Sequence, residues 1–269
     1  MDTKFYTLIT GSTGGLGNSF VKCAISLGHN LFLTSTKQQK LDDLKSQILS
    51  VNPNINIITF KCNFLLDQDI DNLVQYIKEN SININYLINN AGYIIEGSNQ
   101  NMSFDDVYKC IKVNNLSTLK LTREIINLHT FSEPLNIITI GSMAGNYPLP
   151  YMSIYSASKA FLKNYMLAIR EENKKNNIRL LLVEPGAIAT SDAMKQAIKA
   201  QGLKGRLSAV NPDIIAKKAF KLVIKNKPVY IPGGFNKLTD FVSHITPQRL
   251  QIKVAGKMWK KSQAKRNIK

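Results

Sequence analysis

Cysteine and histidine are scarce in this chain of 269 residues. The three cysteines, Cys23, Cys62 and Cys110, are odd in number and widely spaced, so the sequence carries neither a disulfide framework nor a cysteine metal site. The three histidines are equally scattered. We therefore predict free thiols in a reducing cytoplasm and no bound metal.

Long apolar runs are also missing. No run reaches the roughly 18 residues that a bilayer-spanning helix needs, and a strand pattern starts so close to the N-terminus that we expect no signal peptide. A hydrophobic content of 44% and a charged content of 20% are ordinary for a soluble globular protein. The length suits one α/β domain with a sizeable core, and the expected location is cytoplasmic.

Acidic residues number only 18 against 35 basic ones, which gives a net charge of +17. The last 24 residues hold no acid and these bases: Arg249, Lys253, Lys257, Lys260, Lys261, Lys265, Arg266 and Lys269. Nucleic-acid binding by this tail is disfavoured because Trp259 is its single aromatic residue. We predict no nucleic-acid partner.

Strand and helix patterns alternate along the chain. Strands are predicted at 5–10, 30–36, 55–62, 86–91, 136–142, 179–184 and 229–232, and helices after Gly17 and at 41–49, 70–77, 103–129, 153–174 and 213–224. Short repeats of this kind form a parallel sheet covered by helices on both faces, with ligands at the carboxyl ends of the strands. Residues 1–232 are expected to form this domain, and 233–269 a basic amphipathic helical extension.

A glycine-rich turn separates the first strand from the first helix. Gly11, Gly14, Gly15 and Gly17 allow a tight turn and a close approach of the backbone to a ligand. A pyrophosphate would then lie at the positive end of the helix. Strand, glycine turn and helix in this order are the context of a dinucleotide-binding fingerprint.

A second motif combines a hydroxyl, a phenol and an ammonium group. Tyr155 and Lys159, four residues apart, share a face of one helix, and Ser142 ends the preceding strand. A nearby ammonium group lowers the pKa of a phenol by roughly 1–3 units, which suits the phenol to general acid catalysis. Taken alone, a Tyr-x-x-x-Lys pair is more often a surface pair without function.

Together these motifs resemble the classical short-chain dehydrogenase/reductase family over residues 5–232. They are Thr10-Gly11-x-x-x-Gly15-x-Gly17, Asn89-Asn90-Ala91-Gly92, Asn114, Ser142, Tyr155-x-x-x-Lys159 and Pro185-Gly186, in the order the family has them. The resemblance implies a single Rossmann-type domain, a doubly wound parallel sheet in three α/β/α layers, with the C-terminal helical extension added to it. It also implies an oxidoreductase that uses a nicotinamide cofactor.

The resemblance further implies which residues act. Catalysis would rest on Asn114, Ser142, Tyr155 and Lys159, with Asn114 holding a water in a proton relay. The implied cofactor-binding residues are Gly11, Ser12, Gly15, Leu16, Gly17, Ser35, Thr36, Lys37, Asn63, Asn90, Ala91, Gly92, Tyr155, Lys159, Pro185, Gly186, Ile188 and Thr190. Asn63 stands where the family usually has an aspartate.

The end of the second strand bears on the choice of cofactor. An acid there would accept hydrogen bonds from ribose hydroxyls and favour NAD. This chain has Ser35, Thr36 and Lys37 instead, which suit a 2′-phosphate, although Thr36 takes the place of the family's usual arginine. The sequence therefore favours NADP, with NAD as the lesser choice.

Residues 191–208 are interpreted as a mobile substrate lid. Its apolar side chains, Ala193, Met194, Ile198 and Leu203, would either line a substrate pocket or pack on the core, and composition does not separate the two. The expected function is NADP-dependent hydride transfer between nicotinamide and a carbonyl or alcohol substrate, and this lid favours an apolar one. The alternatives are a non-catalytic dinucleotide-binding regulator and, less favoured because only about 80 residues follow Gly186, a nucleotide-sugar epimerase.

Two expectations concern contacts with other molecules. The family commonly forms homo-oligomers through the helices carrying Asn114 and Tyr155, and Phe161, Tyr165 and Ala168 give one of these helices an apolar stripe.

In the extension, Phe235, Leu238, Phe241, Val242 and Ile245 predict a helix over the substrate cleft, and Leu250, Val254 and Met258 share a face of a second helix. The second helix either docks on the body with its basic face in solvent, or lies on an anionic membrane with Trp259 at headgroup level.

Overall fold

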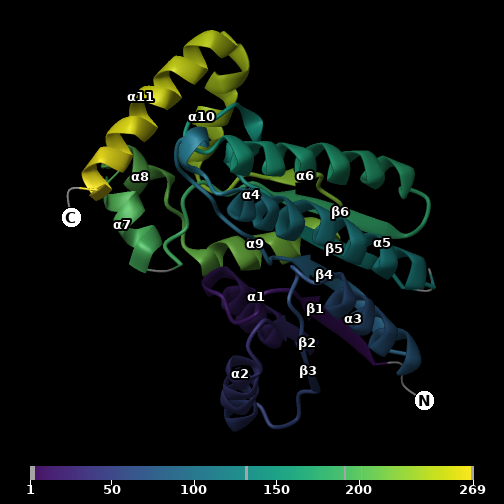
Figure 1. The fold of residues 1–269 in the computed structure, drawn as a ribbon. Helices are drawn as coiled ribbons and strands as arrows, with labels where there is room; N and C mark the ends of the chain where they lie inside the picture. Colours follow the sequence, from purple (N-terminus) through teal and green to yellow (C-terminus); the bar gives the residue numbers. More distant parts are fainter. Residues whose placement is uncertain (1–3, 131–132, 191, 201, 268–269) are drawn as a thin grey trace.

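The computed structural model describes residues 4–267 except 131–132, 191 and 201, and it leaves undescribed the side chains of residues 193, 197 and 264–267. Seven parallel strands form one sheet in the order β3-β2-β1-β4-β5-β6-β7 (Figure 1). The strands are β1 (Phe5–Ile9), β2 (Asn30–Ser35), β3 (Ile57–Lys61), β4 (Asn83–Asn89), β5 (Leu135–Ile140), β6 (Ile178–Val183) and β7 (Val229–Tyr230).

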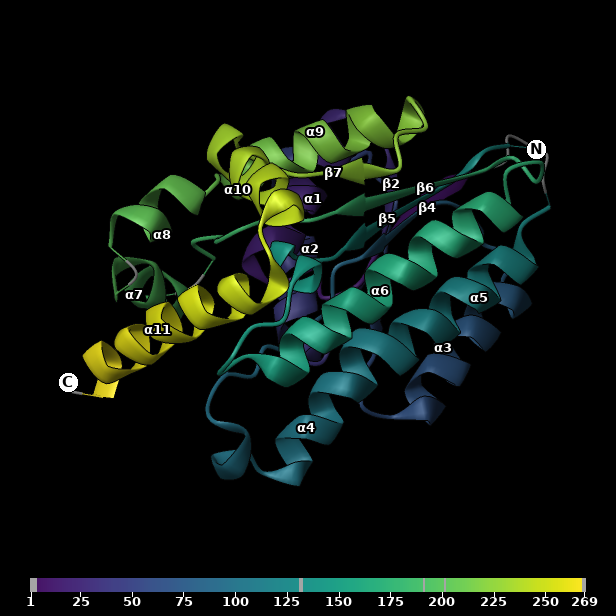
Figure 2. The ribbon, with the colours of Figure 1, turned by 90° about the horizontal axis from the view of Figure 1, so that it is seen from above.

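Helices cover both faces of this sheet. One layer consists of α1 (Gly15–Ser26), α2 (Gln38–Val51) and α9 (Pro212–Ile224), and the other of α3 (Asp67–Glu79), α4 (Phe104–Ile111), α5 (Thr118–Leu128) and α6 (Ser153–Glu172) (Figure 2). The central strands are buried on both faces, so their sequences read as nearly continuous apolar runs. Two separate hydrophobic cores result, one under each helical layer. The predicted doubly wound, Rossmann-type single domain is confirmed.

The strand order reverses next to β1, which lies between β2 and β4. Helices leave the sheet on opposite sides at such a point, and a crevice opens at the carboxyl ends of the two strands. A hydroxyl braces that crevice, because Thr10 Oγ1 accepts from the backbone N–H groups of Asn90 and Ala91, both at 2.9 Å. The glycine turn after β1 and the chain after β4 are thereby held together.

The single helix predicted for residues 103–129 has three parts. Between α4 and α5 lies a π-helical segment, Lys112–Ser117, whose polar side chains are buried. Lys112 contacts Asp67 at 2.6 Å, and Asn115 donates to the backbone carbonyl of Ser158 at 2.7 Å. These bonds stabilise the π-helical turn, which contains one residue more than an α-helical turn. Such π-helical segments occur often at functional sites.

Four helices gather at one end of the molecule. They are α7 (Asp192–Ala200), α8 (Leu203–Ser208), α10 (Gly234–Ile245) and the long α11 (Gln248–Asn267), which crosses from α10 towards α7 (Figures 1 and 2). Short 3-10 turns lie at Asn99–Asn101 and Met143–Asn146. Within the described part of the chain, no helix is both long and apolar enough to cross a membrane.

Candidate active site

The glycine turn packs so tightly that side chains are excluded from it. Gly11 has a φ of +62°, in the left-handed region that glycine adopts without strain. A Cβ on Gly17 would lie 2.2 Å from the Gly11 carbonyl oxygen, and one on Gly15 would lie 2.6 Å from Thr190 Cβ. Free backbone N–H groups at the start of α1 therefore remain open to an anion.

A cleft of about 530 Å³ lies over this turn, at the switch point of the sheet. Most of the predicted cofactor-binding residues line it: Gly11, Gly15, Leu16, Gly17, Ser35, Thr36, Asn63, Asn90, Ala91, Gly92, Tyr155, Lys159, Pro185, Gly186, Ile188 and Thr190. Thr13 also lines the cleft and lies 2.8 Å from Ser35, Oγ1 to Oγ. Nothing in the sequence pattern had marked Thr13, because its place depends on the fold of the turn.

Two predicted cofactor residues are not part of that lining. Ser12 is fully buried, and both its backbone N–H and its hydroxyl donate to the carbonyl of Thr34, at 3.0 and 3.1 Å. Its role in the structure is to fasten the glycine turn to β2. Lys37 is exposed at the start of α2, beside Thr36 at the cleft. Asn63 lines the cleft, with its side-chain oxygen accepting from the Leu65 N–H at 3.1 Å.

Ser142, Tyr155 and Lys159 come together at one end of the cleft. Ser142 follows β5, while Tyr155 and Lys159 belong to the first two turns of α6. The Lys159 ammonium group lies 5.8 Å from the centre of the Tyr155 ring and donates to the Ile140 carbonyl at 2.8 Å. The turn after β5 packs directly on the α6 backbone because Gly145 has no side chain. A Cβ on Gly145 would lie 2.8 Å from the Lys159 carbonyl carbon.

Burial controls the protonation of this cluster. It raises the pKa of the Tyr155 phenol to about 12, and a hydrogen bond with Ser142 offsets the rise only in part. It also lowers the pKa of Lys159 to about 8. The pKa of Tyr155 in the free protein is thus raised, where the sequence predicted a lowered one, and the effect of Lys159 itself stays a prediction. Desolvation is the largest influence on the phenol, which is therefore neutral at physiological pH and keeps a proton to donate.

The Asn114 side chain is fully buried in the π-segment and bonds to two neighbouring elements. Its amide nitrogen donates to the Tyr93 carbonyl at 2.9 Å and to the Ser158 hydroxyl at 3.0 Å, and its oxygen accepts from the Tyr93 N–H at 2.8 Å. It thus joins the chain after β4 to α6, one residue before Lys159. A water relay through Asn114 stays a prediction.

A second cavity, of about 630 Å³, meets the first at Ser142 and Tyr155. Most of its lining is apolar and comes from the helices at the C-terminal end, including Met194, Ile198, Phe235, Val242, Leu250, Val254, Met258 and Trp259. Of the predicted lid residues, Met194 and Ile198 line this cavity, and Leu203 is 73% exposed. The side chain of Ala193 lies outside the described residues. Trp259 is half-buried against the cavity.

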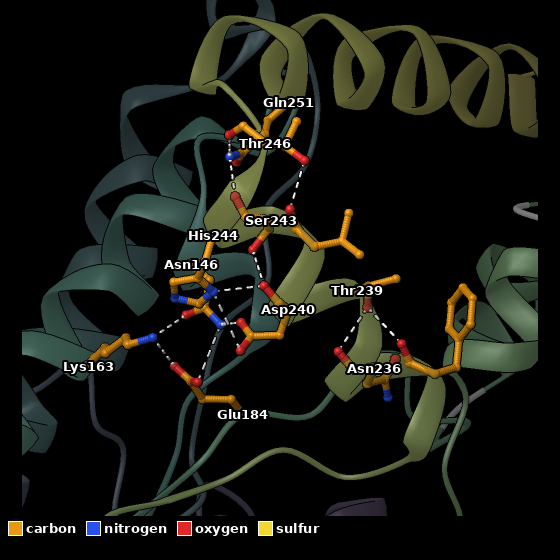
Figure 3. Close-up of polar contacts among 12 residues, drawn as sticks. Asn146, Lys163, Glu184, Asn236, Thr239, Asp240, Ser243, His244, Thr246 and Gln251 are labelled. Atoms are coloured by element: carbon orange, nitrogen blue, oxygen red, sulfur yellow. Dashed lines mark hydrogen bonds and ion pairs between the residues drawn. The ribbon is translucent and has the colours of Figure 1, made fainter.

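A polar network fastens α10 beside the catalytic cluster (Figure 3). Asn146 donates to Asp240 at 2.7 Å and accepts from Lys163 at 2.8 Å, and Lys163 also pairs with the buried Glu184 at 3.5 Å. Burial raises the pKa of Glu184, and the Lys163 charge partly offsets the rise. Sequence reasoning missed this network because its members are up to 94 positions apart.

Two cavities that share a proton donor, one built for a dinucleotide and one apolar, define the class of dinucleotide-dependent oxidoreductases. The sequence model of the short chain dehydrogenases matches residues 6–201. The chain belongs to the short-chain dehydrogenase family, as its motifs predicted. In the described residues, no group of three histidine, cysteine or acidic side chains could hold a metal ion.

Curated relatives agree with this membership, and a solved structure shares the fold. The chain is similar to a very-long-chain 3-oxoacyl-CoA reductase of Neurospora crassa, at 33% identity over 69% of this chain and 57% of the relative. A protein of the same name from Bos taurus is 28% identical over 93% of this chain and 78% of the relative. The chain thus spans little more than half of the fungal relative. A 7β-hydroxysteroid dehydrogenase structure superposes with a TM-score of 0.82 at 19% identity, over 93% of this chain and 96% of that one.

Proposed function

We propose that the protein is an NADP-dependent oxidoreductase that transfers a hydride between nicotinamide and a carbonyl or alcohol substrate. One observation carries the proposal: Ser142 and Tyr155 line the dinucleotide cleft and the apolar cavity at once. A substrate oxygen held there would meet a proton donor and the nicotinamide together. Placing reactants side by side in this way removes much of the entropic barrier to reaction.

The residues of the cleft fit the cofactor. Because Gly17 has no side chain, the backbone N–H groups at the N-terminus of α1 stay accessible to the pyrophosphate. The hydroxyls of Thr13, Ser35 and Thr36 and the nearby Lys37 suit a 2′-phosphate, with no acid among these residues to repel it. At the other end, the backbone of Ile188 and the side chain of Thr190, which line the cleft, would bind the nicotinamide carboxamide.

In the reduction direction, Ser142 donates a hydrogen bond to the substrate carbonyl oxygen, and Tyr155 gives that oxygen its phenolic proton. Lys159, charged below its pKa of about 8, stabilises the phenolate that remains. When bound, the nicotinamide supplies the hydride to the carbonyl carbon. Asn114 holds α6 against the loop after β4, so that Tyr155 and Lys159 keep their places.

The substrate we propose is a medium-length or long apolar carbonyl compound, such as a 3-oxoacyl thioester. The second cavity is lined chiefly by apolar side chains, and Lys204 and Lys261 add positive charge to its wall. An apolar chain inside and an anionic group at the lysines would satisfy both features. Two relatives are named as very-long-chain 3-oxoacyl-CoA reductases, in keeping with this choice.

The direct test is oxidation of NADPH by the purified protein against a panel of carbonyl compounds. We expect turnover with apolar ketones or 3-oxoacyl thioesters and little with small polar ones. If NADPH binds and no carbonyl compound is turned over, a dinucleotide-binding regulator without catalysis becomes the better account.

Replacing Ser35 by aspartate should reverse the cofactor preference. A carboxylate at the end of β2 would repel a 2′-phosphate and accept hydrogen bonds from ribose hydroxyls, so NADP affinity should fall by at least about 10-fold relative to NAD. Calorimetric titration of both cofactors measures this. Ser35→Asn is the matched control, with similar size and no charge. Tighter binding of NAD by the unaltered protein would contradict the proposed preference.

We also propose a cytoplasmic homo-oligomer paired through α4, the π-segment and α6. Leu116 and Phe161 are exposed apolar side chains of this surface, and Phe161 stacks on Tyr165 with ring centres 6.1 Å apart. Exposed apolar side chains on adjacent helices are typical of an interface. Light scattering at micromolar concentration should find a dimer or tetramer, and a monomer alone would contradict this.

A further inference from the structure

Helix α10 carries an apolar ridge that no part of the described chain covers. The ridge consists of Leu238, Phe241 and Ile245, which are 59%, 65% and 70% exposed. They follow one another at helical spacing on one face of α10. None of the three lines the substrate cavity. Large apolar side chains gathered in this way mark a surface that contacts something other than water.

The ridge adjoins the mouth of the substrate cavity. Val242, Leu250, Val254 and Met258 line the cavity and still expose between 39% and 51% of their surface. Apolar side chains that line the cavity and are also open to solvent indicate where the cavity opens to the outside. The ridge and this rim thus form one continuous apolar surface on α10 and α11.

The opposite face of α10 is anchored, so the ridge cannot turn inward. Asn236 donates to the carbonyls of Pro232 and Ser208, at 2.6 and 2.9 Å, and Asp240 accepts from Asn146. Gln251 at the start of α11 donates to the carbonyl of Ser243 at 2.6 Å and fixes the corner between the helices (Figure 3). The ridge is therefore a preformed surface.

Positive charge surrounds this apolar surface. From residue 234 to the end of the chain Asp240 is the only acid, and its side chain faces inward into the network of Figure 3. Among the side chains of these two helices that the structure describes, the exposed lysine and arginine residues are Lys237, Arg249, Lys253, Lys257, Lys260 and Lys261. A second copy of the chain would bring an equally basic face, so self-association here is opposed by repulsion.

We propose that α10 and α11 dock on an anionic lipid bilayer, with the ridge inserted between headgroups and the cavity mouth opening into the lipid. Apolar side chains ringed by lysines are the chemistry that binds such an interface. The inserted residues are Leu238, Phe241 and Ile245, while Trp259 remains against the cavity. An apolar substrate would then reach Tyr155 without crossing water, but the docking itself does not depend on the proposed reaction.

Co-sedimentation of the full chain with vesicles tests the proposal. At low salt, the protein should bind vesicles of phosphatidylcholine mixed with phosphatidylserine, bind pure phosphatidylcholine much less, and dissociate at high salt. The double variant Phe241→Ser, Ile245→Ser should bind the anionic vesicles at least about 10-fold more weakly, since it lacks the inserted side chains. The matched control, Val51→Ser with Ile224→Ser, removes exposed apolar side chains from α2 and α9 and should bind as the unaltered protein does.

Cofactor titration of each variant confirms that the fold is intact, because neither pair lines the dinucleotide cleft. No binding to anionic vesicles at low salt, or equal binding by the ridge variant, would overturn the proposal. If neither protein binds vesicles and the ridge variant loses a dimer that the unaltered protein forms, the surface belongs to a second copy instead.

Discussion

Changing Tyr155 to phenylalanine should lower kcat for carbonyl reduction by roughly 10²–10⁴-fold, the usual contribution of a positioned general acid. The ring remains, so the packing of the two cavities against α6 is preserved. The change removes the phenol that lines both cavities, and with it the proton that the substrate oxygen needs. Cofactor affinity should change little, because the ammonium group of Lys159 is retained.

Steady-state rates with any accepted carbonyl compound measure this effect. Tyr165→Phe is the matched control, since Tyr165 belongs to the same helix and lines neither cavity. It should retain activity within a few-fold of the unaltered protein. If Tyr155→Phe also stays within a few-fold, the phenol is not the proton donor.

Replacing Gly17 by alanine should weaken dinucleotide binding by about 10–100-fold. The new Cβ would lie 2.2 Å from the Gly11 carbonyl oxygen, a distance at which the backbone must move. Overpacking of this kind costs about 1–3 kcal/mol, and here the distortion falls on the N–H groups that receive the pyrophosphate. Part of the cost should also appear as a lower free energy of unfolding.

Gly14 supplies the control for that experiment within the same turn. A Cβ at Gly14 would lie 3.4 Å from the Gly11 carbonyl oxygen, an ordinary contact, and its φ of −80° suits any residue. Gly14→Ala should therefore bind the cofactor nearly as the unaltered protein does. Equal affinities for the two variants, measured by fluorescence titration, would show that close packing at Gly17 does not shape the cleft.

Local patterns carried most of the fold prediction. The apolar runs that predicted buried strands all fall within one parallel sheet, because a strand buried on both faces needs no polar alternation. The predicted catalytic cluster came from short spacings, and the fold brings Ser142 and Tyr155 to one place. Spacing along a helix or beyond a strand survives folding unchanged, which is why it was informative.

What the sequence could not predict depends on distant residues. The π-segment exists because Lys112 and Asn115 find partners on other elements, and no local pattern encodes those partners. Ser12 was chosen by its place in a motif, and only the fold shows that its hydroxyl donates to the Thr34 carbonyl of β2. The direction of the Tyr155 pKa shift was missed because sequence spacing shows the nearby charge of Lys159 and not the burial.

In the C-terminal extension, too, local spacing predicted the helices but not their contacts with the rest of the chain. Helical spacing predicted α10 and the shared face of Leu250, Val254 and Met258. It could not show that this face would line the substrate cavity together with Trp259. That face lines the cavity, while Leu238, Phe241 and Ile245 of α10 remain an apolar surface open to other molecules.

The most direct test of the account follows the hydride itself. With NADPH deuterated at nicotinamide C4, the protein should convert an apolar ketone or a 3-oxoacyl thioester into an alcohol with deuterium on the former carbonyl carbon, as mass spectrometry would detect. The same reaction with Tyr155→Phe should give almost no labelled alcohol. Two results would contradict the account. If neither NADPH labelled on one face of C4 nor NADPH labelled on the other gives a deuterated alcohol, the hydride does not come from the cofactor. If the unaltered protein and Tyr155→Phe form the labelled alcohol at equal rates, Tyr155 is not the proton donor.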